Sequence, residues 1–486
     1  MVFSSLIFLY AFFPLSLLAY GLCRGNHRLQ NAALLIFSLI FYTWGEPKYV
    51  LLLMGMSFAA WLCAGQVARC TGTAKRLWLA AAAAVMLGLI GFFKYSGMIF
   101  PLFGAVPEFV RRIALPIGIS FYTFQLLTYV VDVYRGQAQA QRSYWNVLLY
   151  AALFHQCIAG PIVRYQTIEQ ELFIPGRRQP EVARGVSRFC AGLAKKALLA
   201  NPCGALADTM LLADAAASNP ALFAQNLSFL SQQSVLGAWL GIGAYALHIY
   251  LDFSAYSDMA IGMGQMLGLH YPENFNYPYL SRSVTEFWRR WHISLGTFFR
   301  DYVYIPLGGS RHGLARMILS TFLVWALTGL WHGASWNFVL WGLWFFLFLM
   351  VERAGLKKLL DKIPVLSNLY LLLVVSLGWA IFRFTDLRLG LALIRSLLGG
   401  NGNPLTSFSA EIQLQSHQFL LLAAIVASLP LGRWLRQRLE QGCARSAALT
   451  WCWNVVLYSL IPVALLLLST ACLVGDSYNP FLYFRF

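Results

Sequence analysis

Long apolar runs constrain this chain more than any other feature, because each approaches the length that a helix needs to cross a lipid bilayer. A crossing takes about 20 mostly apolar residues, and several of the runs are shorter or are interrupted by Pro or Gly. We therefore expect an all-α polytopic membrane protein with roughly ten to twelve crossings plus re-entrant segments. The runs cover residues 2–22, 31–44, 49–63, 77–93, 113–131, 144–163, 234–251, 317–330, 336–350, 370–384, 419–429 and 450–474.

The composition supports the same conclusion. Hydrophobic residues make up 59% of the 486 residues and charged residues 11%, whereas a soluble domain carries about 25% charged residues. A water-soluble core cannot bury this much apolar surface. No soluble domain or internal repeat stands out, so we expect one membrane-embedded domain over residues 1–486. The first run has no basic segment before it and exceeds the length of a signal-peptide core, which predicts a retained span.

The net charge of +17 has two interpretations. Strongly basic proteins often bind nucleic acid, but here the Lys and Arg residues lie in short loops between apolar runs. Such loops face anionic lipid and the cytoplasm, so we expect contacts with membrane lipid and none with nucleic acid. The basic loops at 23–30 and 69–76 predict an external N-terminus. The basic stretch 164–196 is amphipathic, and we expect it to lie on the cytoplasmic side without crossing.

The nine cysteines show no pattern of a disulfide framework or a zinc site. None forms a Cys-x-x-Cys pair, and most lie within or beside apolar runs. We expect buried, reduced thiols that pack as small hydrophobic side chains, and no bound metal.

Polar residues in the apolar middle of the chain are the candidate functional groups, because ionisable side chains at membrane depth are costly. His332 lies in GLWHGASW, beside Trp331. A lone histidine in an apolar run is more often structural than catalytic. Gly329 and Gly333 favour the catalytic interpretation, since glycine permits a broken helix and the close approach of backbone or ligand. Neutral imidazole also suits general-base catalysis near neutral pH.

His292 lies in FWRRWHISL, next to Arg289, Arg290 and Trp291. An anchor at the membrane interface would explain the Arg and Trp residues. It would not explain the polar stripe that continues through the following turns to Arg300. A helix lying on the surface and a helix lining a water-filled funnel both produce such a stripe, so both interpretations stay open.

Asp252 and Asp258 are six residues apart, which is not a same-face spacing on a helix. They are therefore not an obvious carboxylate pair for acid–base catalysis. The better interpretation is that they are buried ion-pair partners of Arg289, Arg290 or Arg300.

Several segments of the chain closely resemble the membrane-bound O-acyltransferase (MBOAT) family. LDFSAYSDMAIG, ENFNYPYLSRSVTEFWRRWHISLGTFFRDYVYIPLGG and GLWHGASW carry the resemblance, together with LPIGISFYTFQLLTYVVDVYRG and FHQCIAGPIVRY. They are most similar to the bacterial branch, which includes the membrane subunits of alginate and peptidoglycan O-acetylation and relatives acting on cellulose and teichoic acid. The likeness extends over nearly the whole chain, and the unbroken match at 273–309 makes it specific.

The resemblance implies a fold and a reaction. The fold is a ring of helices around a thinned centre, with a central tunnel and a catalytic core over about residues 113–350. The reaction is transfer of acetyl from a cytoplasmic donor, acetyl-CoA, with no bound cofactor. A periplasmic SGNH-type partner enzyme then passes the group to a polysaccharide of the alginate or peptidoglycan type. The implied location is the bacterial inner membrane.

The same resemblance implies roles for the two histidines. The signature histidine of the family corresponds to His332, which would take the proton from the attacking hydroxyl. His292, or an arginine near it, would hold the carbonyl oxygen as it gains charge. The basic faces at 164–196 and 289–311 have two open interpretations, binding of CoA phosphates and contact with lipid head groups. Residues expected to bind the donor or support the site are Arg289, Arg290, Trp291, Asp252, Asp258, Arg300 and Trp331.

The sequence closes on an aromatic tail at 476–486 that ends in NPFLYFRF. The general interpretation is an anchor packed into apolar surroundings. Tyr483, however, is the only hydroxyl in NPFLYFRF, and a chain end can thread into a tunnel. A phenol has a pKa of about 10, so its acetyl ester stays activated. Tyr483 is therefore also a candidate acyl carrier between the thioester and a partner protein.

Two functions of other classes also fit parts of the pattern. Broken helices and buried charges are typical of transporters and channels, although the two halves of the chain show no internal symmetry. A non-catalytic membrane scaffold for a periplasmic acetyltransferase is the other alternative, and it predicts that His332 can be replaced without loss of acetylation.

Overall fold

The computed structural model describes residues 2–104, 106–158, 160–212, 219–475 and 478–479. Every secondary-structure element within these ranges is a helix, which confirms the predicted all-α class. The chain forms two compact units, each built from segments that are distant in the sequence. The first unit comprises Met1–Leu193, Tyr256–Glu273 and Leu457–Leu473, and the second comprises Ala194–Ala255, Asn274–Val456 and Val474–Phe486.

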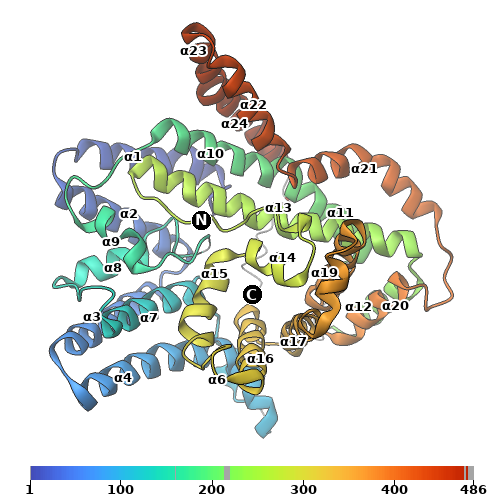
Figure 1. The fold of residues 1–486 in the computed structure, drawn as a ribbon, viewed down its shortest axis with the longest axis horizontal. Helices are drawn as coiled ribbons and strands as arrows, with labels where there is room; N and C mark the ends of the chain where they lie inside the picture. Colours follow the sequence, from blue (N-terminus) through green and yellow to red (C-terminus); the bar gives the residue numbers. More distant parts are fainter. Residues whose placement is uncertain (1, 105, 159, 213–218, 476–477, 480–486) are drawn as a thin grey trace. The chain divides into compact units, whose positions relative to one another are not determined.

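In the first unit, α3 lies against α4, α7 and α8 (Figure 1). Its buried face carries the small residues Ser57, Ala60 and Ala64, which let neighbouring helices approach closely. The helices of this unit are η1 (Phe8–Phe12), α1 (Phe13–Leu22), α2 (His27–Gly45), α3 (Val50–Arg69), α4 (Gly72–Ile90), η2 (Gly91–Tyr95), α5 (Ser96–Ile99), η3 (Phe100–Phe103), α6 (Glu108–Arg111), α7 (Ile119–Arg135), α8 (Tyr144–Ala152), α9 (Tyr165–Phe173), α10 (Val182–Ala194), the last part of α13 (Val235–Leu267), η8 (Val456–Leu460) and α24 (Ile461–Gly475).

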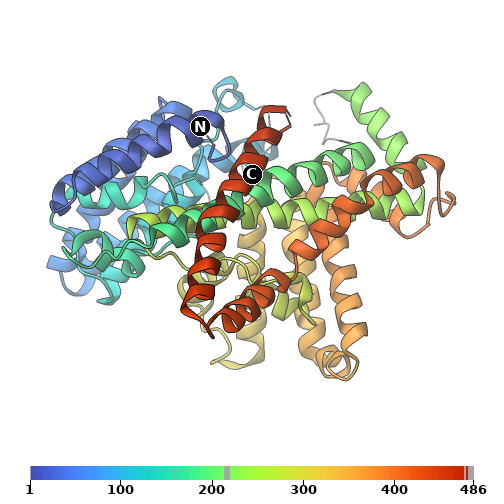
Figure 2. The ribbon, with the colours of Figure 1, turned by 90° about the horizontal axis from the view of Figure 1, so that it is seen from above.

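The second unit has an aromatic core in which Trp291, Trp325, Trp341 and Trp379 are buried together. α17 and α19 run side by side in orange (Figure 2). The helices of this unit are η4 (Lys195–Ala200), α11 (Asn201–Leu211), α12 (Pro220–Gln232), the first part of α13, η5 (Pro278–Leu280), α14 (Val284–Arg290), α15 (Ile293–Phe299), η6 (Arg300–Tyr304), α16 (Gly313–His332), α17 (Trp336–Val351), η7 (Glu352–Leu356), α18 (Lys357–Leu360), α19 (Pro364–Arg383), α20 (Leu387–Leu397), α21 (Phe408–Ala427), α22 (Leu431–Cys443) and α23 (Ala447–Val455).

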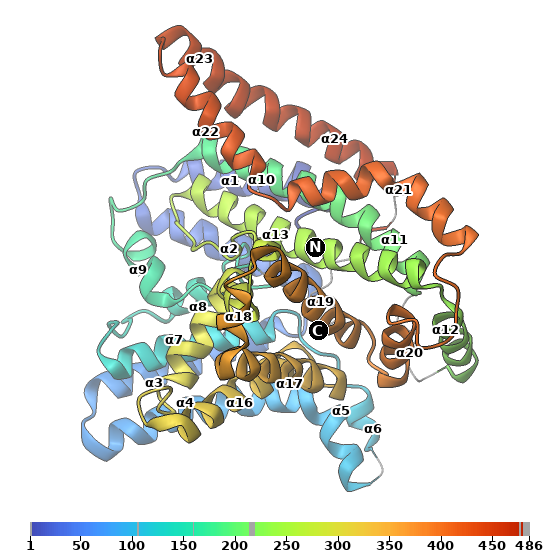
Figure 3. The same cartoon turned by 45° about the vertical axis from the view of Figure 1, so that its right-hand side comes forward.

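The helices α16 and α17 pack as a close pair (Figure 3). A Cβ on Gly329 would lie 2.3 Å from the carbonyl oxygen of Phe338, and a Cβ on Gly342 would lie 2.3 Å from that of Trp325. Any side chain at either position would clash with the facing backbone. Glycine thus permits the contact between the two helices, as predicted for Gly329.

Seven helices in the described residues are long and apolar enough to cross a membrane, or eight if the bent pair α21 and α22 counts as one span. This confirms a multi-pass membrane protein. Several other expected runs form shorter helices, such as α1 and α8, so the total number of crossings stays a prediction. The single domain, the ring and the tunnel also stay predictions. The seven are Val50–Arg69, Gly72–Phe103, Val235–Leu267, Gly313–His332, Trp336–Leu360, Pro364–Arg383 and Ala447–Gly475.

Candidate active site

His292 occupies a left-handed turn between α14 and α15. Its backbone angles are φ 44° and ψ 55°, a region in which histidine is one of the better tolerated non-glycine residues. Asn274 holds the turn in place. Its backbone oxygen accepts from the Ile293 N–H at 3.0 Å, and its side-chain oxygen accepts from the backbone N–H and the hydroxyl of Ser294 at 3.2 and 2.9 Å. The imidazole Nδ1 of His292 lies 3.1 Å from the same oxygen.

These contacts fix the tautomer of His292. A backbone N–H donates and never accepts, so the Asn274 atom that Ser294 contacts is the oxygen, and His292 Nδ1 must donate to it. Burial lowers the pKa of His292, which lies outside the candidate spans, to about 3. The ring is therefore neutral near pH 7, with its proton on Nδ1 and its lone pair on Nε2. This arrangement leaves no second proton for a developing oxyanion, so the structure favours a nearby arginine for that role.

His332 is the last residue of α16 and is 6% exposed. The next residue, Gly333, has an extended backbone, and α17 begins at Trp336. The helix therefore breaks directly after the histidine, as predicted for Gly333, whereas Gly329 lies within α16 and does not interrupt it. A Cβ on Gly333 would lie 2.2 Å from the ring of Phe338, so a side chain at this position would displace that ring.

Aromatic rings surround the His332 imidazole. The centroids of the Trp341 and Phe382 rings lie 4.9 and 5.3 Å from it. The Trp331 ring lies 5.0 Å from the His332 ring and 5.7 Å from the His292 ring. One indole thus contacts both candidate histidines, which are 40 residues apart in the sequence.

A cavity of about 580 Å³ adjoins the His292 turn. α14, α15, η6 and α16 supply its walls, which combine apolar rings with threonine hydroxyls. Two arginines, Arg289 and Arg300, line it together with His292. Arg289 is exposed, and Arg300 forms an ion pair with Asp301 at 2.6 Å. The cavity therefore presents positive charge beside the turn that positions His292.

The neighbouring Arg290 lies outside this lining and forms an ion pair with Glu286 at 2.6 Å. The two residues are one helical turn apart on α14, which is a spacing that brings side chains together. Arg290 therefore supports α14, and Arg289 is the residue of the pair that faces the cavity.

Comparison with known proteins identifies the family. The sequence profile of MBOAT, the membrane-bound O-acyltransferase family, matches residues 77–374. The chain belongs to the MBOAT family. The probable alginate O-acetylase AlgI of Azotobacter vinelandii is 36% identical over an alignment of 520 positions, which covers 100% of each chain. AlgI of Pseudomonas aeruginosa is 36% identical over 92% of this chain and 85% of its own length. The peptidoglycan O-acetyltransferase of Helicobacter pylori is 29% identical over 100% of this chain and 98% of its own.

This MBOAT protein is thus a multi-pass membrane acyltransferase that uses an acyl donor. The predicted membership of the family is confirmed, and the enzyme interpretation with it. The specific roles of His332, His292 and the arginines stay predictions. Their geometry agrees with a shared site in one respect, since Trp331 contacts both imidazoles.

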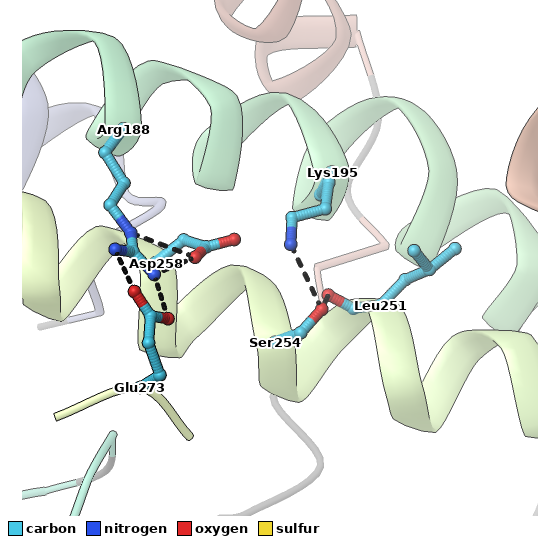
Figure 4. Close-up of polar contacts among 6 residues, drawn as sticks. All are labelled: Arg188, Lys195, Leu251, Ser254, Asp258 and Glu273. Atoms are coloured by element: carbon cyan, nitrogen blue, oxygen red, sulfur yellow. Dashed lines mark hydrogen bonds and ion pairs between the residues drawn. The ribbon is translucent and has the colours of Figure 1, made fainter. Parts of the chain in front are cut away.

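The predicted arginine partners of Asp252 and Asp258 are wrong. In the second unit, Asp252 forms a buried ion pair with Lys196 at 2.7 Å. In the first unit, Asp258 pairs with Arg188 at 3.0 Å, and Arg188 also contacts Glu273 (Figure 4). The physical reason is that these pairs depend on which helix packs against α13 in the fold, and the spacing along the chain does not show this. Each then meets a cation from the segment formed by α10 and η4.

This correction changes the interpretation of the basic stretch 164–196. Arg178 donates to the carbonyl oxygens of Glu171 and Leu172, and Lys195 donates to Ser254 at 3.2 Å (Figure 4). Together with Arg188 and Lys196, these cations have partners within the protein. Their charges are therefore engaged within the protein, which makes them less suited to binding CoA phosphates.

Tyr483, the proposed acyl carrier, lies outside the described residues. The functional residue that sequence reasoning missed is Asn274, although it is part of the quoted segment ENFNYP. An amide 18 residues before His292 gives no spacing signal, because only the folded turn brings the two together. Phe382, which contacts His332 from α19, was missed for the same reason.

Replacing His292 by alanine should make stability less dependent on pH. The native ring stays neutral down to about pH 3, whereas an unfolded histidine takes up a proton below about pH 6.5. The unfolded state therefore binds more protons between these values, and native stability is lost as the pH falls through this window. We expect the melting temperature in detergent to fall less between pH 7 and 5 in His292→Ala than in the wild type. An equal fall in both proteins would contradict the assignment.

Proposed function

We propose that this protein moves acetyl groups from cytoplasmic acetyl-CoA across the bacterial inner membrane for O-acetylation of an extracellular polysaccharide. The observation that carries the proposal is the joint contact of Trp331 with His332 and His292, beside a cavity that contains two arginines. Full-length similarity to alginate and peptidoglycan O-acetyltransferases supports acetyl as the acyl group and an alginate-type polymer or peptidoglycan as the acceptor.

The proposed chemistry is attack of a hydroxyl on a thioester. His332 takes the proton as the hydroxyl oxygen bonds to the acetyl carbon. The carbonyl oxygen gains negative charge, which Arg289 or Arg300 stabilises, because the neutral His292 has its proton engaged with Asn274. The carbon–sulfur bond then breaks, the ester forms, and the thiol of CoA leaves with the proton from His332. His292 positions the turn on which the cavity residues lie.

The volume of the cavity supports the proposal that only part of the donor enters the protein. Its volume of about 580 Å³ falls within the range of about 300–1,000 Å³ that is typical of small-molecule sites. This suffices for the acetylated thiol arm of CoA. The charged nucleotide end cannot cross lipid, so it remains in the cytoplasm, and arginine is well suited to bind its phosphates.

Tyr483 is the proposed first acceptor. Its phenol has a pKa of about 10, well below that of a sugar hydroxyl, so an acetyl-tyrosine keeps enough transfer potential to pass the group on. A protein-bound ester divides one difficult transfer into two easier ones. The second transfer is to a serine of a periplasmic SGNH-type partner, which selects the polysaccharide.

The proposed function can be tested by asking from which side of the membrane the protein uses acetyl-CoA. Purified inside-out vesicles should incorporate label from [acetyl-14C]acetyl-CoA, whereas sealed right-side-out vesicles should not, because CoA does not cross the bilayer. Permeabilising the right-side-out vesicles should restore labelling, which controls for the amount of active protein. Labelling of sealed right-side-out vesicles alone would refute a cytoplasmic donor.

A further inference from the structure

The first unit contains another cavity, between the end of α3 and the loop that joins α7 to α8. These three helices pack together (Figure 1). The cavity has a volume of about 480 Å³, within the range of about 300–1,000 Å³ that is typical of small-molecule sites. Its lining residues all belong to the first unit, whereas those of the cavity beside His292 belong to the second. The two cavities are therefore built from different parts of the chain.

Two arginines give this cavity its charge. Arg69 is the last residue of α3, Arg142 lies in the loop, and both are exposed. Among the residues that the structure describes, no carboxylate lines the cavity and no ion pair engages either guanidinium. Gln66 adds an amide that can donate hydrogen bonds. Such a lining suits an anion with several oxygen acceptors, and arginine binds phosphate groups particularly well.

The loop that carries Arg142 is held against the helices by hydrogen bonds. Trp61 Nε1 donates to the Arg142 carbonyl oxygen at 3.3 Å. The backbone N–H of Gln141 donates to the Tyr129 hydroxyl at 2.8 Å, and the Gln141 side-chain oxygen accepts from Asn146 at 2.8 Å. The positions of the cavity walls are therefore set by contacts within the protein.

An apolar face of α3 continues from the cavity along the helix. Phe58, Leu62, Gly65 and Arg69 recur at intervals of four, three and four residues, which places them on one side of the helix. Phe58 is 49% exposed and Leu62 is 38% exposed. Because α3 is one of the candidate spans, we expect these side chains to meet acyl chains. The order along α3 is thus apolar, then open, then cationic, which matches a phospholipid from its acyl chains to its phosphate.

Aromatic residues beside the cavity indicate its depth in the membrane. Trp145, at the start of α8, is 58% exposed, and its ring lies 5.2 Å from that of Tyr144. The Tyr144 ring in turn lies 6.3 Å from that of Trp61, which lines the cavity. Trp and Tyr are enriched where the membrane meets water. We therefore expect the cavity to lie at the level of the lipid head groups.

Gly65 contributes open space to the cavity. A Cβ at this position would have no heavy atom of the described chain within 4 Å. At Gly185 and Gly262 of the same unit, by contrast, a Cβ would lie 2.6 and 2.7 Å from a facing backbone oxygen. Glycine inside a helix is less favourable than alanine. Close packing against protein does not explain this cost at Gly65, whereas a ligand in the cavity would.

We propose that this cavity binds the head group of an anionic phospholipid, with the phosphate diester between Arg69 and Arg142 and an acyl chain along Phe58 and Leu62. Two cations without a carboxylate favour an anionic lipid, because a zwitterionic lipid would bring its own ammonium group into the same positive field. A free phosphate would make the charged contacts alone. CoA would make no contact with the apolar face of α3 through acyl chains.

Two variants remove the site in different ways. Arg69→Gln combined with Arg142→Gln removes both charges at exposed positions. Gly65→Leu fills the cavity and leaves the charge unchanged. Since a side chain at this position enters open space, the variant is expected to fold, and its melting temperature without lipid checks this.

Each variant has a matched control in the first unit. Arg24→Gln combined with Arg28→Gln removes the same charge from two exposed residues of the basic loop 23–30. Gly55→Leu adds the same side chain to α3 at another position where a Cβ meets open space, outside the lining of the cavity.

The measurement is a titration of the purified full-length protein in detergent with phosphatidylglycerol, in which native mass spectrometry counts the bound lipids. The melting temperature is recorded in parallel, because a ligand that binds the native state stabilises it. We expect tighter binding of phosphatidylglycerol than of phosphatidylcholine. Each arginine near anionic lipid contributes a factor of about five in affinity, so the double arginine variant should bind roughly 25-fold more weakly. Gly65→Leu should lose the site, and both controls should match the wild type.

Several results would overturn the proposal. Equal affinity for phosphatidylglycerol in the wild type and in both cavity variants would reject the site. Equal binding of phosphatidylcholine would reject a site for anionic lipid. Stabilisation by inorganic phosphate that equals stabilisation by the lipid would assign the cavity to a free anion. Displacement of the lipid by acetyl-CoA would assign it to the donor instead.

Discussion

Replacing His332 by alanine is expected to abolish acyl transfer while the protein still inserts into the membrane. The imidazole lies at the end of α16 among Trp331, Trp341 and Phe382. Without it, no group at this position removes the proton of the attacking hydroxyl. General-base catalysis contributes roughly 10²–10⁴-fold in rate, so the loss should fall in this range. The measurement is incorporation of label from acetyl-CoA by the purified variant, together with polysaccharide acetylation in cells.

The control variants separate chemistry from packing. Alanine leaves a void among the aromatic rings, which by itself lowers stability. His332→Gln fills more of this space and should be equally inactive. His417→Ala removes a partly buried histidine whose Nδ1 contacts the Gln413 oxygen within its own helix, and this variant should keep full activity. Normal acetylation by His332→Ala at wild-type protein levels would support the non-catalytic scaffold instead.

The loss in His292→Ala should be smaller than in His332→Ala. His292 donates its proton to Asn274 and occupies a left-handed turn, so its contribution is the position of the cavity residues. An alanine in this turn is strained but retains the chain path through the bonds of Asn274 to Ile293 and Ser294. This difference between the two histidines follows from their geometry and is not apparent from the sequence.

Local patterns predicted those features that depend on neighbouring residues. The apolar runs indicated a helical membrane protein, and Gly333 indicated a helix break, which the structure places directly after His332. The family motifs indicated the region in which Trp331 contacts both histidines. In each case, the deciding residues lie within a few positions of one another, so their spacing along the chain contains the information.

Features that depend on distant contacts were missed or assigned wrongly. Arg289, Arg290 and Arg300 are closer in the sequence to Asp252 and Asp258 than Lys196 and Arg188 are. The two carboxylates nevertheless pair with Lys196 and Arg188. The pairing is set by the way that α10 and η4 lie along α13. No periodicity along the chain encodes this alignment. The hydrogen bonds between Asn274 and the His292 turn are a second example of such distant contacts.

Tyr483→Phe is expected to abolish acetylation of the polysaccharide while protein level and partner binding stay normal. The substitution removes one oxygen and keeps the ring, so an anchor that works through packing would be unaffected. A carrier would lose its only nucleophile, because Tyr483 is the only hydroxyl in NPFLYFRF. Phenylalanine offers no residual chemical route, so the expected loss is complete.

Intact-mass analysis of the C-terminal peptide supplies the direct measurement for Tyr483. After incubation with acetyl-CoA in the absence of acceptor, one added acetyl group is expected on the wild-type peptide and none in Tyr483→Phe. His332→Ala should also lack the modification, because the phenol then has no base to take its proton. Addition of an acceptor protein should remove the acetyl group from the wild type, since an aryl ester is more activated than the alkyl ester that forms. Normal polysaccharide acetylation by Tyr483→Phe would show that the tyrosine is an anchor and that the acceptor hydroxyl meets the thioester directly.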